Sequence, residues 1–222
     1  MVVYLVPTGR NRHELYSETS EEPAVSPGEN AARWQQWLHA ATVKWHELVE
    51  QARSGAGTGR MARWRDRVVC RLAESIAEQR TLWALRDCST ATAAYPAQLP
   101  EDDARRILND LLKQARRYHG RWLIVDLVLS IASAVLTIVP GPNLLAYYFV
   151  FRLVGHLQSW RGARTALDRM TWTFEANPGL AELAALVEVP RSARASRVAA
   201  IAARLNLPQL SAFFDRAAVP SA

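Results

Sequence analysis

The chain is poor in the residues that commonly build disulfide frameworks, metal centres and catalytic sites. It contains two cysteines, Cys70 and Cys88, which form no C-x-x-C pair. This spacing indicates reduced thiols, with no disulfide framework and no structural zinc. The phosphate-binding G-x-x-x-x-G-K-[ST], metalloprotease H-E-x-x-H and hydrolase G-x-S-x-G motifs are absent from the sequence. We therefore expect neither an enzyme nor a cofactor.

Lysine is also scarce, and this decides which side chain carries the positive charge. Lys44 and Lys113 are the only lysines among 27 Lys and Arg, and the formal net charge is +6. An arginine excess of this kind is typical of contact with nucleic acid or anionic lipid, and it also arises from solvated helix faces. No RNA-recognition motif with interleaved aromatic residues is present, so we expect no nucleic acid partner.

The N-terminal segment 1–7, MVVYLVP, does not have the pattern of a targeting sequence. It has no basic start, and its apolar run is too short for a signal peptide. It also differs from the Arg- and Ser-rich amphipathic segments typical of transit peptides. We therefore expect any membrane location to come from an internal segment.

One internal stretch, residues 122–157, concentrates apolar side chains and is interrupted once, by a turn-forming tetrapeptide. The pattern predicts a hydrophobic helical hairpin over 119–160, because a Pro-Gly-Pro sequence ends one helix before the next begins. The predicted turn residues are Pro140, Gly141, Pro142 and Asn143. Arginines that could meet lipid head groups flank both helices, namely Arg116, Arg117, Arg121, Arg161 and Arg164.

The length of the two predicted helices leaves three arrangements open. Residues 123–139 would form roughly 26 Å of helix at about 1.5 Å per residue, whereas a hydrocarbon core is about 30 Å thick. The return helix, 143–160, contains Arg152 and His156, and a central arginine costs at least about 2.5 kcal/mol. The alternatives are two short spans with both termini cytoplasmic, a re-entrant or interfacial hairpin, and a hairpin buried in a soluble core.

A polar face runs along the first helix and continues onto the second when the hairpin is folded about its turn. Two interpretations compete: a path for protons or a cation, and a structural seam of hydroxyl-to-backbone bonds and a buried carboxylate pair. Two helices cannot enclose a pore, so transport would need a homo-oligomer or a membrane-protein partner. The seam candidates are Asp126, Ser130, Ser133, Thr137, Arg152 and His156.

Periodicity predicts a mainly α fold of the α+β class. Strands are expected at 2–6, 13–17 and 89–95, and amphipathic helices over about 27–52, 61–83 and 100–121. Short helices are expected at about 180–190 and 193–217, bounded by Pro190 and Pro208. The expected regions are an N-terminal α+β soluble part with a small β-sheet, 1–118, the hairpin, 119–160, and a helical C-terminal tail, 161–222.

Short blocks spread in order along the chain resemble the mitochondrial K+/H+ exchange-related family. The hairpin block is the most legible of them, and no single motif is specific. The resemblance implies a membrane-associated role in K+/H+ exchange or organelle volume control, and it brings no catalytic residues. The blocks are 4–7, 16, 34–45, 78 with 82–85, 95–96, 118–119, 140–143, 148–152, 160–162 and 207–210.

Two function classes follow from these patterns. The first is a membrane-associated component or accessory factor of K+/H+ exchange, in contact with lipid at a bacterial cytoplasmic membrane, or at the mitochondrial inner membrane if the source is eukaryotic. The second is a soluble or peripheral interaction or scaffold protein that buries the hairpin in its own core or in a partner.

Overall fold

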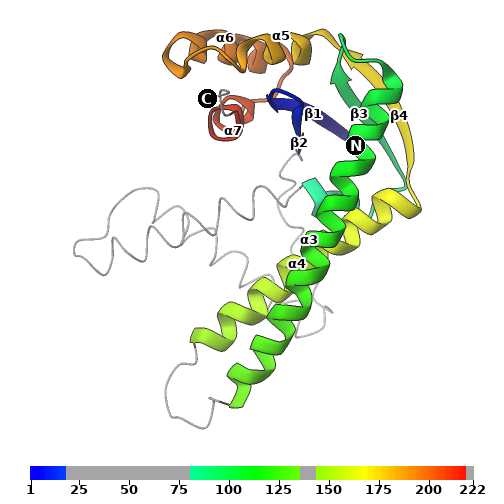
Figure 1. Ribbon diagram of the computed structural model, residues 1–222, viewed down its shortest axis with the longest axis vertical. Helices are drawn as coiled ribbons and strands as arrows, with labels where there is room; N and C mark the ends of the chain where they lie inside the picture. Colours follow the sequence, from blue (N-terminus) through cyan, green and yellow to red (C-terminus); the bar gives the residue numbers. More distant parts are fainter. Residues whose placement is uncertain (19–80, 136–143, 219–222) are drawn as a thin grey trace, which may run out of the picture. The chain divides into compact units, whose positions relative to one another are not determined.

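The computed structural model describes residues 1–18, 81–135 and 144–218. Within these residues, four strands form one sheet in the order β2-β1-β3-β4 (Figure 1). The strands are β1 (Val2–Gly9), β2 (Arg12–Tyr16), β3 (Thr90–Pro96) and β4 (Thr171–Asn177). The helices are α3 (Glu101–Val135), α4 (Leu144–Asp168), α5 (Pro178–Leu186), α6 (Arg191–Arg204) and α7 (Leu210–Ala217).

The sheet begins with an antiparallel hairpin and continues with parallel strands. β1 and β2 pair antiparallel across a tight turn in which Asn11 has a φ of 62°, a left-handed conformation that Asn adopts more readily than most residues. β3 pairs parallel with β1 and with β4. Two parallel neighbours need a crossover connection, and between β3 and β4 this connection consists of α3 and α4.

Both faces of the sheet are covered by helices, because its strands alternate apolar side chains between two cores. Val3 and Leu5 of β1 belong to a core shared with α3 and α4, whereas Val6 belongs to a core shared with α5, α6 and α7. Leu108 on α3 and Leu183 on α5 are fully buried examples from the two sides. The result is a three-layer arrangement with the sheet in the middle (Figure 1).

In the C-terminal layer, the start of α5 and the end of α6 are both capped. The Asn177 side chain accepts hydrogen bonds from the backbone N–H groups of Gly179 and Leu180, at 2.9 and 3.3 Å, so β4 leads directly into a capped α5. After α6, Asn206 takes a φ of 55° and the N–H of Leu207 donates to the carbonyl of Ala202. This is the Schellman ending that stops a helix without leaving its last carbonyls unpaired.

α3 and α4 lie side by side and run in opposite directions. Arg116 meets Asp168 at one level, and Asp126 meets Arg152 at another, so residue numbers rise on α3 as they fall on α4. Only the first part of α3 packs on the sheet, and beyond Leu112 its neighbour is α4. The predicted boundaries at 118/119 and 160/161 fall inside these two helices.

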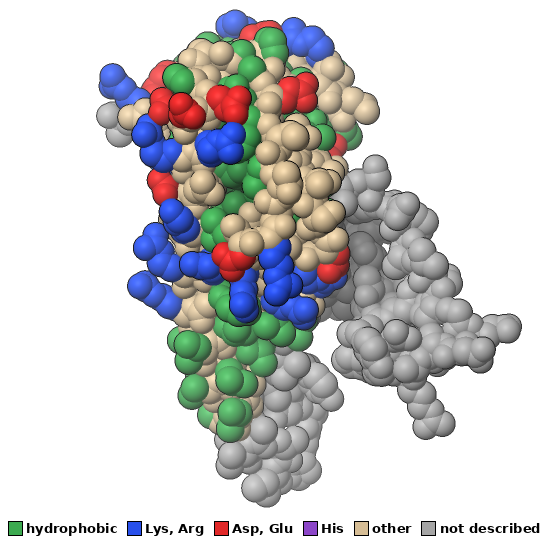
Figure 2. Space-filling view, turned by 90° about the vertical axis from the view of Figure 1, so that its right-hand side faces the viewer, with side chains coloured by type: hydrophobic (Ala, Val, Ile, Leu, Met, Phe, Trp, Pro, Cys, Tyr) green, Lys and Arg blue, Asp and Glu red, His purple; other side chains and the backbone are tan. Residues whose placement is uncertain are grey.

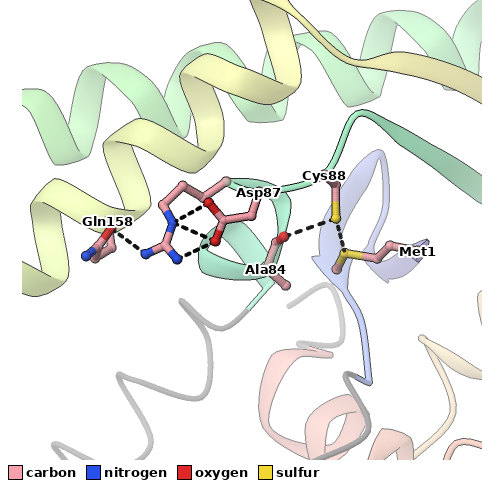
Figure 3. Close-up of polar contacts among 6 residues, drawn as sticks. Met1, Ala84, Asp87, Cys88 and Gln158 are labelled. Carbon is pink, nitrogen blue, oxygen red and sulfur yellow. Dashed lines mark hydrogen bonds and ion pairs between the residues drawn. The ribbon is translucent and has the colours of Figure 1, made fainter. Parts of the chain in front are cut away.

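Residues 81–86, a short helix and the turn residue after it, dock on α4 through two side-chain hydrogen bonds. The Trp83 indole donates to the Ser159 hydroxyl at 2.8 Å, and Arg86 donates to the Gln158 amide oxygen at 2.8 Å. Arg86 also donates to the Asp87 carboxylate at 3.0 Å, and Figure 3 labels its two partners, Asp87 and Gln158. In the same view, the Cys88 thiol lies between the Ala84 carbonyl and the Met1 sulfur, so Cys88 is a free cysteine used in packing.

The fold class predicted from the sequence, mainly helical α+β with a small sheet, is confirmed. The strands expected at 2–6, 13–17 and 89–95 are present, as are the short C-terminal helices. β4 is a correction, because we expected only helix after Trp160. The helices predicted over about 27–52 and most of 61–83, and the turn predicted at 140–143, lie outside the described residues.

We predict that Gly162→Ala destabilises the folded chain by roughly 2–3 kcal/mol, net of the helix-propensity gain of alanine. An added Cβ at Gly162 would lie 1.7 Å from the backbone carbonyl oxygen of Leu82, and backbone cannot move aside cheaply. Gly120→Ala is the matched control, since its Cβ would meet only the Trp160 ring, at 3.3 Å. Urea unfolding followed by circular dichroism measures both variants, and equal stabilities would contradict this packing.

Candidate functional site

The centre of the α3–α4 pair is a buried carboxylate. Asp126 on α3 has no exposed surface. Its two oxygens lie 3.4 Å from the Arg152 guanidinium and 3.5 Å from Nε2 of His156, both on α4. At those distances neither oxygen accepts a hydrogen bond from a described residue. The sequence-based prediction that Asp126 would pair with Arg152 or His156 agrees with this geometry, which shows both contacts.

A second buried histidine extends this polar cluster by one step. Nδ1 of His119, on α3, lies 2.9 Å from Nδ1 of His156, and both residues are 7% exposed. The Trp122 ring stacks on His156, and Tyr118 meets both imidazoles edge-on. His119 was absent from the predicted seam, because it lies seven positions before Asp126 and outside the polar run considered. We call Asp126, Arg152, His156 and His119 the polar cluster.

Of the other seam residues, Ser130 has a structural role, and the side chains of the remaining two are not described. Ser130 donates its hydroxyl to the Asp126 carbonyl at 2.7 Å, which is the hydroxyl-to-backbone bond expected of serine inside a helix. The side chain of Ser133 and the whole of Thr137 lie outside the described residues. The seam as a continuous path therefore stays a prediction.

The flanking arginines form a band at the level of the polar cluster and above it, toward the sheet. Arg116 and Arg164 both lie 3.6 Å from Asp168, and Arg164 also covers the Trp160 ring. Arg117, Arg121 and Arg161 are exposed. We call these residues the basic belt: Arg116, Arg117, Arg121, Arg161 and Arg164.

Past the basic belt, α3 is apolar on most of its exposed surface. Figure 2 shows a band of Lys and Arg followed by hydrophobic surface toward the C-terminal end of α3. Among the described residues, no helix combines the length and the apolar character needed to cross a bilayer. We call the following residues the apolar end, with their exposed fractions: Ile124 (65%), Val125 (43%), Leu127 (47%), Val128 (59%) and Ile131 (63%).

Comparison with known families gives a match over residues 2–170, to the family described as mitochondrial K+-H+ exchange-related. The chain belongs to this family. The matched span contains the polar cluster, the basic belt and the apolar end, and it ends just before β4. No curated protein and no solved structure matches the chain. The resemblance inferred from short sequence blocks is thereby confirmed at the level of the family.

The electrostatics of the polar cluster favour neutral histidines at neutral pH. Burial, and then the nearby His156, lowers the pKa of His119 to about 4. Burial also lowers the pKa of His156, where Asp126 opposes the shift and Arg152 adds to it. No group of three or more metal-ligating side chains occurs among the described residues.

We predict that acid destabilises the chain partly through His119. Its pKa in the folded state lies below the ordinary value of 6.5, so the unfolded chain binds the proton first as the pH falls. The contribution of His119 to the free energy of unfolding is therefore intact above pH about 6.5 and decreases between pH about 6.5 and 4. Urea unfolding at a series of pH values measures this slope.

His119→Gln should flatten the slope of the free energy of unfolding against pH. His13→Gln is the comparison, since burial alone lowers the pKa of His13. His13→Gln should remove the contribution of His13 to the pH dependence of the free energy of unfolding. It should leave the contribution of His119 unchanged. A His119→Gln slope that equals the unmodified slope would contradict the buried, neutral state of this residue.

Proposed function

We propose that the chain acts at a membrane surface as a component or accessory factor of K+/H+ exchange, with the apolar end buried among lipid acyl chains. The observation that carries this proposal is the exposed apolar surface of α3, beside the basic belt. Ile124, Val128 and Ile131 are each at least 59% exposed. Contiguous apolar surface of this kind is costly in water and marks an interaction site.

Charge complementarity is the reason to choose lipid as the occupant. The basic belt includes residues from both helices and lies next to the apolar end, as arginines do at the head-group level of an anionic membrane. Each arginine near such a surface contributes about 1 kcal/mol to binding. A helix that binds in a protein groove is usually apolar on one face only. On α3, residues 124, 125, 127 and 128 are all apolar and exposed, so the apolar surface covers adjacent faces of the helix, as lipid contact requires.

The aromatic residues fit the same placement. Trp122 is 38% exposed and lies on α3 between Arg121 of the basic belt and Ile124 of the apolar end, whereas Tyr118 is 53% exposed and lies within the belt. Trp and Tyr concentrate at membrane interfaces because their rings are apolar and their N–H or O–H groups are polar. The Arg152 guanidinium covers the Trp122 ring with its centre 5.1 Å away, which brings a cation to the same level.

We predict that Ile124→Asp combined with Ile131→Asp strongly weakens binding of the full chain to vesicles of phosphatidylcholine with phosphatidylglycerol. Burying two new carboxylates in hydrocarbon costs several kcal/mol, so the vesicle-bound fraction should fall at least about tenfold. Flotation of vesicles with the purified chain measures this. Val2→Asp is the matched control, an exposed apolar position on β1, and it should bind like the unmodified chain. Full binding by the double variant would leave a protein partner as the occupant of the apolar end.

We predict a different signature for Arg117→Gln combined with Arg121→Gln. Loss of two cations should weaken binding to vesicles that contain phosphatidylglycerol by roughly tenfold or more, and it should reduce the salt dependence of that binding. Binding to vesicles of phosphatidylcholine alone should change little. An equal loss on both vesicle types would contradict the head-group role of the basic belt.

The relation to ion exchange is tested separately from lipid binding. Membrane vesicles prepared with and without the full chain are compared for K+-dependent proton flux, measured with a pH-sensitive dye trapped inside. The proposal predicts lower flux without the chain. Equal flux in both preparations would remove the exchange role and leave the lipid-binding role standing.

A further inference from the structure

The hydrogen bond between the two buried histidines can hold only one proton. His119 and His156 approach through Nδ1 on both rings, at 2.9 Å. One Nδ1 must carry the proton and donate it, while the other must be bare and accept it. The pair therefore has a defined direction at neutral pH, and its surroundings decide which direction that is.

Asp126 sets the direction. Nε2 of His156 lies 3.5 Å from a carboxylate oxygen of Asp126, so a bare Nε2 would place a lone pair against a negative charge. The proton of neutral His156 therefore lies on Nε2, its Nδ1 is bare, and His119 donates Nδ1–H to it. The second bare nitrogen of the pair is then Nε2 of His119. It takes no part in the hydrogen bond between the rings, so it can take up a proton.

We propose that His119, His156 and Asp126 form a binding site for one proton, with an internal relay between the two imidazoles. The incoming proton binds to Nε2 of His119. The N–H bond at Nδ1 of His119 breaks as an N–H bond at Nδ1 of His156 forms. The pair gains one proton and one positive charge, which comes to rest on His156 beside the carboxylate of Asp126.

The groups around the pair explain why the charge rests there and why the site takes one proton only. The described charged or titratable neighbours are Tyr118 and Asp126 on α3 and Arg152 on α4. Asp126 favours imidazolium on His156, while Arg152 opposes it and keeps the site neutral until the pH falls. A second proton would set two N–H groups against each other at 2.9 Å, which is consistent with the low pKa of His119.

This proton site does not depend on lipid binding or on the exchange role, since all of its groups lie within α3 and α4. It makes the α3–α4 pair sensitive to pH at the level of the basic belt. If the exchange role holds, the cluster offers a place in this chain where a proton is taken up. If that role fails, the proton site still stands or falls by its own measurement.

The test is nitrogen-15 NMR of the histidine side chains of the full chain over a series of pH values. At neutral pH we expect His119 as the Nδ1–H tautomer and His156 as the Nε2–H tautomer. On acidification, both rings should respond at the same midpoint, because one proton changes both. His13 should titrate as a single independent group. Independent midpoints for His119 and His156, or the Nε2–H tautomer on His119 at neutral pH, would overturn the relay.

Asp126→Asn keeps the shape of the side chain and removes its charge, so the shared midpoint should fall by about one pH unit or more. Asp110→Asn is the matched control, because Asp110 is an exposed carboxylate on the same helix, and it should leave the midpoint in place. An unchanged midpoint in Asp126→Asn would remove Asp126 from the site. The tautomers of the unmodified chain decide the remainder of the proposal even if this variant folds poorly.

Discussion

The arrangement of α3 and α4 depends on a carboxylate with no exposed surface, Asp126. Among the described residues, its ion-pair partners are Arg152 and His156, both on α4. Burying a carboxylate costs several kcal/mol unless a nearby charge compensates. Arg152 and His156 are one helical turn apart on α4, so they can both reach Asp126 in only one register of the two helices. A slip of α4 by one residue would turn at least one of them away.

That register has consequences well beyond the polar cluster. It brings arginines from both helices to neighbouring levels, which produces the basic belt, and it leaves Ile124, Val128 and Ile131 exposed around α3. In the other direction, α3 and α4 continue into a core that includes Leu108, Ala163 and β1. At one end, α3 and α4 form one layer of the three-layer fold and pack there through apolar side chains. At the other end, the described residues leave the apolar end of α3 exposed.

Much of this could be predicted from the sequence, because periodicity is a local property. The acidic start of α3, the strands near the N-terminus and the punctuation at Pro190 and Pro208 all depend on neighbouring residues. The carboxylate pair could be predicted too, since folding an antiparallel pair about a Pro-Gly-Pro turn fixes approximate levels. The family assignment agrees with the blocks that suggested it.

What could not be predicted depends on tertiary structure. β4 carries alternating Thr and aromatic residues at 171–174, but it becomes a strand by pairing in parallel with β3, a strand that precedes two long helices. His119 looks unremarkable in the sequence, because its significance comes from a nitrogen on the opposite helix. The close approach of Gly162 to a backbone carbonyl at Leu82 is likewise visible only in three dimensions.

The contact between Asp126 and Arg152 sets the α3–α4 register. A double-mutant cycle tests it most directly, with Asp126→Asn and Arg152→Gln made singly and together and the free energy of unfolding measured for each. We expect a coupling energy of about 1 kcal/mol or more, within the range of about 0.5–3 kcal/mol found for residues in contact within one network. Changes that add to within about 0.5 kcal/mol, the behaviour of independent sites, would contradict it.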